Sequence, residues 1–73
     1  MPSFAVPHTD DQLEVDPERA VVMVFRNAWN RDSSGTPDEI HTFAALRGEA
    51  ALMNRFTAML AGADAAELRR LVG

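Results

Sequence analysis

The chain has 73 residues, no cysteine and a formal net charge of −4 at pH 7. This length allows a single domain with little buried surface to spare, and the lack of cysteine excludes disulfides and thiolate metal sites as supports. Such a chain is expected to gain stability by oligomerising or by docking onto a larger protein.

Residues 1–15 are predicted to form an extended acidic arm. Pro2 and Pro7 interrupt this segment, and its apolar residues follow no sustained period. The first 18 residues hold five acids and no base. The isolated apolar side chains of the arm either pack against the rest of the chain or dock on a partner.

Residues 17–31 carry the first helix-start signal. Asp16 is a capping carboxylate, and Pro17 suits the first helical position. The apolar run Val21–Phe25 would by itself suit a buried strand. At about 100° per residue, however, its apolar side chains fall on one face with arginine and asparagine opposite, so the periodicity favours a helix over 17–31.

Residues 37–61 are expected to form a second helix. Thr36 supplies a capping hydroxyl, Pro37 the first helical position and Glu39 the carboxylate of a capping box. The apolar face of this segment changes direction near Gly48, so the helix either breaks at Gly48 and folds back or continues with its halves covered by different neighbours. The lack of a loop of several residues favours one continuous helix.

A third helix is expected over residues 64–72. Gly62 suits the left-handed conformation that closes the preceding helix, and Asp64 begins a further capping pattern. The sequence as a whole therefore predicts an all-α fold: a small three-helix domain over residues 16–73, preceded by the extended acidic N-terminal arm over residues 1–15.

The two histidines do not indicate a catalytic or metal site. His41 follows Asp38 by three residues, so that carboxylate could orient the imidazole, and His8 precedes two acids in the arm. No metal-ligand spacing is met, and both histidines are interpreted as solvated. The chain also lacks a nucleophile–base–acid set and a phosphate-binding glycine loop. We therefore expect no enzyme activity, no catalytic residue, no metal, no cofactor and no small-molecule substrate.

An apolar stripe in the second predicted helix is the candidate binding site. It consists of Leu52, Met53, Phe56, Met59 and Leu60. Residues at this spacing usually pack inside their own domain, but methionine and phenylalanine also adapt to a partner groove. Because Ile40 and Phe43 point in the opposite direction, a chain of this size is not expected to cover both faces. The stripe is therefore predicted to be partner-binding.

These features predict a protein-binding module that acts as a homo-oligomer or as an accessory or inhibitory subunit of a larger protein. The alternatives are a structural or assembly subunit of a larger particle, such as a phage, and a DNA-binding regulator. Scattered arginines and a negative net charge disfavour nucleic acid as the partner. The sequence holds neither a membrane span nor a signal peptide, so we expect no membrane partner and a cytoplasmic location.

Overall fold

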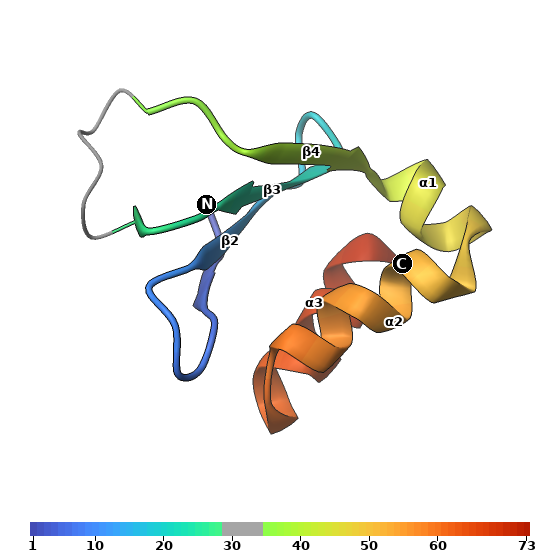
Figure 1. The fold of residues 1–73 in the computed structure, drawn as a ribbon. Helices are drawn as coiled ribbons and strands as arrows, with labels where there is room; N and C mark the ends of the chain where they lie inside the picture. Colours follow the sequence, from blue (N-terminus) through green and yellow to red (C-terminus); the bar gives the residue numbers. More distant parts are fainter. Residues whose placement is uncertain (29–34) are drawn as a thin grey trace.

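The structure is a computed structural model that describes residues 1–28 and 35–73. Four antiparallel strands lie side by side in chain order, and three helices follow them (Figure 1). The elements are β1 Ser3–Ala5, β2 Gln12–Asp16, β3 Val21–Phe25, β4 Glu39–Thr42, α1 Phe43–Gly48, α2 Ala50–Met59 and α3 Gly62–Val72. This α+β fold shows that the predicted all-α three-helix fold is wrong, because the first half of the chain forms a sheet.

The segment predicted to be the first helix contains the central strand β3. Its residues alternate in burial, with Val22 and Val24 almost fully buried against the helices. Hydrogen bonding to β2 on one side and β4 on the other outweighs the helical spacing of its apolar residues. The helix predicted over 17–31 is therefore wrong for the described part of that range, and residues 29–31 lie outside the described residues.

The Asp-Pro pair that resembled a helix start forms a turn between β2 and β3. Asp16 Oδ1 accepts hydrogen bonds from the backbone N–H groups of Glu18 (3.1 Å) and Arg19 (3.3 Å). The turn closes at Ala20, whose φ of 57° is left-handed. A side chain that caps a helix can equally cap a turn, and here the strand pairing on both sides selects the turn.

Residues 1–15, expected to be an extended acidic arm, supply β1 and most of β2. Phe4 pairs with Leu13 across the two strands, and the Val15 N–H donates to the Pro2 carbonyl oxygen at 2.9 Å. Phe4 and Leu13 are both buried in the core. The segment thus packs into the same core as the described strands and helices that follow it.

The start of the second predicted helix, over 37–61, is strand β4. The first helix of the structure begins at Phe43, and its N-cap is Thr42 rather than Thr36. Thr42 Oγ1 accepts a hydrogen bond from the Ala45 N–H at 3.0 Å. Pairing with β3 thus holds Glu39–Thr42 extended, and the capping function moves to the threonine at the end of the strand.

The helical segment that follows is broken, as one of the two sequence interpretations proposed. Glu49 separates α1 from α2 in an extended conformation, with φ −127° and ψ 97°. The preference for one continuous helix was therefore wrong, and the break after Gly48 accounts for the change in direction of the apolar face. The third predicted helix, over 64–72, is confirmed by α3.

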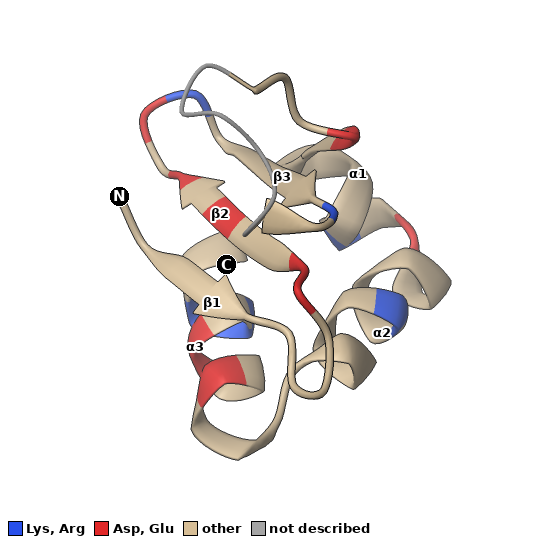
Figure 2. Ribbon diagram, turned by 60° about the vertical axis from the view of Figure 1, so that its left-hand side comes forward, with Lys and Arg blue, Asp and Glu red and all other residues tan. Residues whose placement is uncertain are grey.

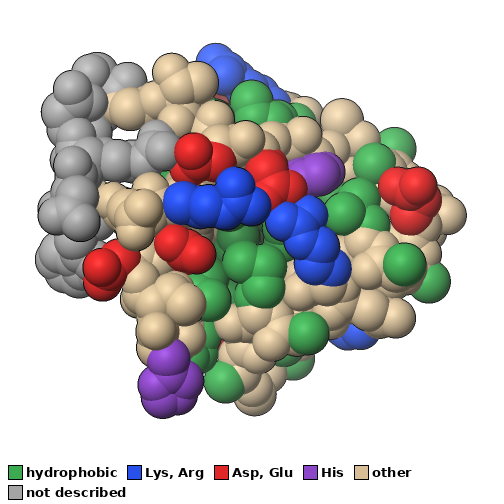
Figure 3. All heavy atoms as spheres, viewed as in Figure 1, with side chains coloured by type: hydrophobic (Ala, Val, Ile, Leu, Met, Phe, Trp, Pro, Cys, Tyr) green, Lys and Arg blue, Asp and Glu red, His purple; other side chains and the backbone are tan. Residues whose placement is uncertain are grey.

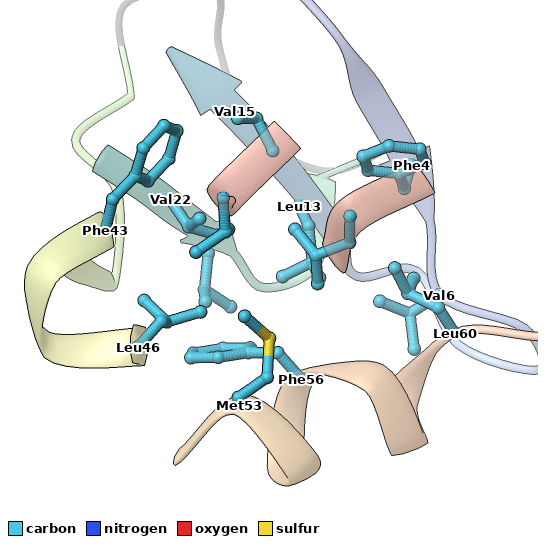
Figure 4. Packing of buried hydrophobic residues seen from close by; sticks show 13 residues of the cluster. Phe4, Val6, Leu13, Val15, Val22, Phe43, Leu46, Met53, Phe56 and Leu60 are labelled. Atoms are coloured by element: carbon cyan, nitrogen blue, oxygen red, sulfur yellow. The ribbon is translucent and has the colours of Figure 1, made fainter. Parts of the chain in front are cut away.

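The hydrophobic core lies between one face of the sheet and the three helices, which are on the same side of the sheet in Figures 1 and 2. Its buried residues are Phe4, Val6, Leu13, Val15, Val22, Val24, Phe43, Leu46, Met53, Phe56, Leu60, Leu68 and Val72 (Figure 4). No helix among the described residues combines the length and the apolar character that crossing a membrane requires.

Candidate binding surface at the β4 edge

The stripe predicted to bind a partner lies mostly in the core of this chain. Phe56 is fully buried, and Met53 and Leu60 are only 8% and 7% exposed. Leu52 and Met59 are partly buried and pack against the same core. Figure 4 shows Met53 and Phe56 of α2 pointing toward the strands. Because the helix is broken, α1 and α2 each direct their apolar face at the sheet. Phe43 and Leu46 of α1 are therefore covered as well as most of the stripe.

A different surface is left open at β4, which is an edge strand of the sheet. The Phe43 N–H donates to the Ala20 carbonyl oxygen at 2.8 Å, so Phe43, and by alternation His41, direct their backbone groups at β3. The N–H and C=O groups of Ile40 and Thr42 consequently point to the free edge. Within the described part of the chain, no further strand pairs with them.

The face of the sheet away from the helices is apolar beside this edge. Val21 and Met23 of β3 lie on that face, and Met23 pairs with Ile40 of β4. Ile40 is 59% exposed, a large fraction for an isoleucine side chain. A sheet covered on one side usually alternates apolar and polar residues, which β3 does not do. We call Val21, Met23, Ile40 and Thr42 the β4 edge surface.

On the helix-facing side of β4, Glu39 is the centre of an ionic cluster. Arg55 of α2 binds it with both ends of its guanidinium, Nη1 to Oε1 at 2.8 Å and Nη2 to Oε2 at 2.7 Å. Arg26 Nη2 donates to Oε2 at 2.6 Å, and His41 Nε2 lies 2.9 Å from Oε1. Figure 3 shows this group of basic, acidic and histidine side chains at the surface, with hydrophobic side chains beside it. We call these four residues the Glu39 cluster.

Aromatic contacts hold the Glu39 cluster against the core. The Arg55 guanidinium carbon lies 4.9 Å from the centre of the Phe56 ring, a cation–π contact. The His41 ring meets the same phenylalanine edge to face, with 5.1 Å between ring centres. Phe56 therefore contacts two of the three side chains that reach Glu39.

The cluster is suited to holding charge in place rather than to proton transfer. The hydrogen bond from Arg55, followed by that from His41, lowers the pKa of Glu39 from 4.5 to about 2. Each carboxylate oxygen already takes part in two contacts. A general base must be able to take up a proton near neutral pH, and this carboxylate is ionised and fully engaged.

His8 is exposed, as the solvated interpretation predicted, whereas His41 is partly buried. His41 lies on a strand and contacts Glu39, whereas the sequence suggested Asp38 on a shared helix. His8 is exposed in the turn between β1 and β2, with a φ of 65°. In residues 1–28 and 35–73, no three histidine, aspartate or glutamate side chains come together as a metal site would require.

Sequence reasoning missed both the β4 edge surface and the Glu39 cluster. Glu39 and His41 alternate with Ile40 and Thr42, a spacing typical of a strand, and this alternation was the available signal. No local pattern joins Glu39 to Arg26 and Arg55, which are 13 and 16 residues away.

No protein-family model matches the chain, and neither a curated protein nor a solved structure matches it.

Proposed function

We propose that this chain is a protein-binding module that self-associates, with the β4 strands of two copies pairing antiparallel about a two-fold axis. The observation that carries the proposal is Ile40, 59% exposed on an edge strand whose outward backbone groups pair with no described strand. An exposed apolar edge of this kind is a template for another strand. Pairing would remove the isoleucine from water and satisfy its backbone groups.

The β4 strand is complementary to itself in one register. If Ile40 of one copy pairs with Ile40 of the other, the two residues exchange N–H to O=C hydrogen bonds and their side chains touch. Met23 of each copy would extend this apolar contact on the open face of the sheet. On the opposite face, Glu39 would lie across from the partner's His41, so that a carboxylate faces an imidazole. A contact of this type is isologous and closes at two copies.

The ionised state of Glu39 and the occupied lone pairs of its carboxylate support binding in place of catalysis. The absence of cysteine agrees with a cytoplasmic setting for such an interaction. A strand of another protein could take the place of the second copy, as in an accessory or inhibitory subunit, and the experiment below separates the two.

The test is the mass of the chain in solution, measured by sedimentation equilibrium at micromolar concentration. The expected species has twice the 8.0 kDa mass of one chain. Ile40→Lys should give a monomer, since two ammonium groups would lie opposite each other at the centre of the contact. Its far-UV circular dichroism should match that of the unsubstituted chain, because the side chain is exposed in the monomer.

The matched control is Ala5→Lys, which adds the same charge at β1, the opposite edge of the sheet. This variant should remain dimeric. Amide hydrogen exchange provides a second readout: Ile40 and Thr42 should exchange more slowly as the concentration rises. A monomeric unsubstituted chain would refute self-association and leave a foreign strand as the occupant, whereas a dimer unaffected by Ile40→Lys would place the contact elsewhere.

A further inference from the structure

A cleft between the three helices forms a second candidate site, separate from β4. Its volume is about 380 Å³, and α1, α2 and α3 line it with Leu46, Arg47, Ala50, Met53, Asn54 and Arg69. Gly73, just after α3, completes the lining beside Arg47. Ligand pockets generally measure about 300–1,000 Å³, so this cleft has room for a small molecule only.

Two arginines of the cleft differ from the other arginines that the structure describes. Arg19, Arg26, Arg55 and Arg70 each form an ion pair with an aspartate or a glutamate. Arg47 and Arg69 donate to neutral oxygens instead, and within residues 1–28 and 35–73 neither has a carboxylate side chain within ion-pair distance. Within these residues, no carboxylate side chain therefore pairs with the two guanidinium groups of the cleft.

Neutral hydrogen bonds hold both guanidinium groups in place. Arg47 Nη1 donates to the Val72 carbonyl oxygen at 3.0 Å. Arg69 Nη2 donates to Asn54 Oδ1 at 3.2 Å and to Thr57 Oγ1 at 3.3 Å. A guanidinium has five N–H donors, so each arginine keeps several for a ligand. With its oxygen accepting from Arg69, the Asn54 amide presents its N–H groups as further donors.

Apart from the backbone of Gly73, the rest of the lining is apolar. Leu46 and Met53 belong to the core, at 1% and 8% exposure, and Ala50 lies beside them at the start of α2. We propose that this cleft binds a small organic carboxylate, with the carboxylate between Arg47 and Arg69 and a short aliphatic stem against Leu46 and Met53. A planar carboxylate matches the fork of a guanidinium. The net charge of −4 disfavours polyanions.

The probe is butyrate, titrated into the full 73-residue chain and followed by the amide and arginine Nε–H signals in NMR spectra. Ionic strength is held constant with sodium chloride. Butyrate should produce saturable shifts in residues 46–54 and 69–73. Acetate should bind several-fold more weakly because it lacks the stem, and inorganic phosphate should also bind more weakly. Shifts that do not saturate, or that acetate, phosphate and chloride reproduce equally, would overturn the proposal.

Substitutions assign the binding to the two arginines. Arg47→Gln and Arg69→Gln should each weaken butyrate binding by about tenfold or more, since each removes a charge-assisted hydrogen bond. Arg19→Gln, at an exposed arginine on the turn between β2 and β3, is the matched control and should leave the affinity unchanged. Equal affinity in all three variants would refute the site.

A fourth variant covers the case in which loss of an arginine unfolds the chain. Ala50 is exposed at the first position of α2, where an acidic side chain is favourable. Ala50→Glu should fold, place its own carboxylate beside the arginines and abolish butyrate binding. Its melting temperature should rise, because the cleft then contains a counter-charge. Unchanged butyrate binding in folded Ala50→Glu would contradict the proposal.

Discussion

Replacing Glu39 by glutamine should destabilise the chain at neutral pH, because it removes the anion that Arg55 and Arg26 share. The pKa of Glu39 falls from 4.5 to about 2 in the folded chain. At about 1.36 kcal/mol for each tenfold change in proton affinity, this corresponds to roughly 3.4 kcal/mol of stabilisation. The side chains of Arg26 and Arg55 are 52% and 43% exposed, so water screens the interaction. We therefore expect a loss of about 1–2 kcal/mol.

The sign of the effect gives it a pH window. A lowered pKa in the folded state means that the stabilisation is complete above pH 4.5 and is lost as the pH falls toward about 2. The unsubstituted chain and Glu39→Gln should therefore differ at pH 7, by about 5–10 °C in melting temperature for a chain of this size, and converge at pH 2.

The assay is thermal unfolding followed by circular dichroism at several pH values, with Glu18→Gln on the exposed turn as the control. Repeating it in the Ile40→Lys background separates folding stability from association. Glu18→Gln should melt like the unsubstituted chain throughout. A difference between Glu39→Gln and its parent that stays constant from pH 7 to pH 2 would refute the ionic role of the cluster.

Two further predictions concern the helical half of the chain. Gly48→Ala should raise the free energy of unfolding by about 0.5–1 kcal/mol, because Gly48 is helical and a β-carbon there meets no atom within 4 Å. Gly62→Ala should lower it by about 1 kcal/mol, since Gly62 has a φ of 50°. Urea denaturation of the two variants measures both changes, and equal effects would contradict the prediction. Phe56→Ala should cost about 3–5 kcal/mol and leave little folded protein, while Met59→Ala, at the partly buried margin, should retain the helical circular dichroism signal.

Local sequence signals determined the C-terminal half. Gly62, with a φ of 50°, marks the boundary before α3 as predicted, whereas the capping function expected of Asp64 is absent and Ala61 is the N-cap. The change in direction of the apolar face near Gly48 marked the place where the helix breaks. These features succeed because a helix satisfies its hydrogen bonds within a few residues, so its limits depend on neighbours in the sequence. The exclusion of disulfides and thiolate metal sites likewise follows from composition alone, because the chain has no cysteine.

The sheet was decided by the tertiary structure. Val21–Phe25 is apolar enough for a helix or a strand, and it becomes a strand because Gln12–Asp16 and Glu39–Thr42 bond to it from both sides. The period-two spacing of Phe4 with Val6 and of Leu13 with Val15 was a signal for strands, but each run is short. Strand pairing joins residues that are distant in sequence, which a local pattern does not record.

The candidate sites also depend on the tertiary structure. Glu39 and Arg55 come from β4 and α2, and Arg26 lies just after β3, so only packing of α2 against the sheet brings their charges together. The stripe on α2 was correctly recognised as apolar from its spacing, but that spacing does not say what lies opposite. With the first half of the chain folded as a sheet, the core covers most of the stripe, and Ile40 on the free edge is exposed instead.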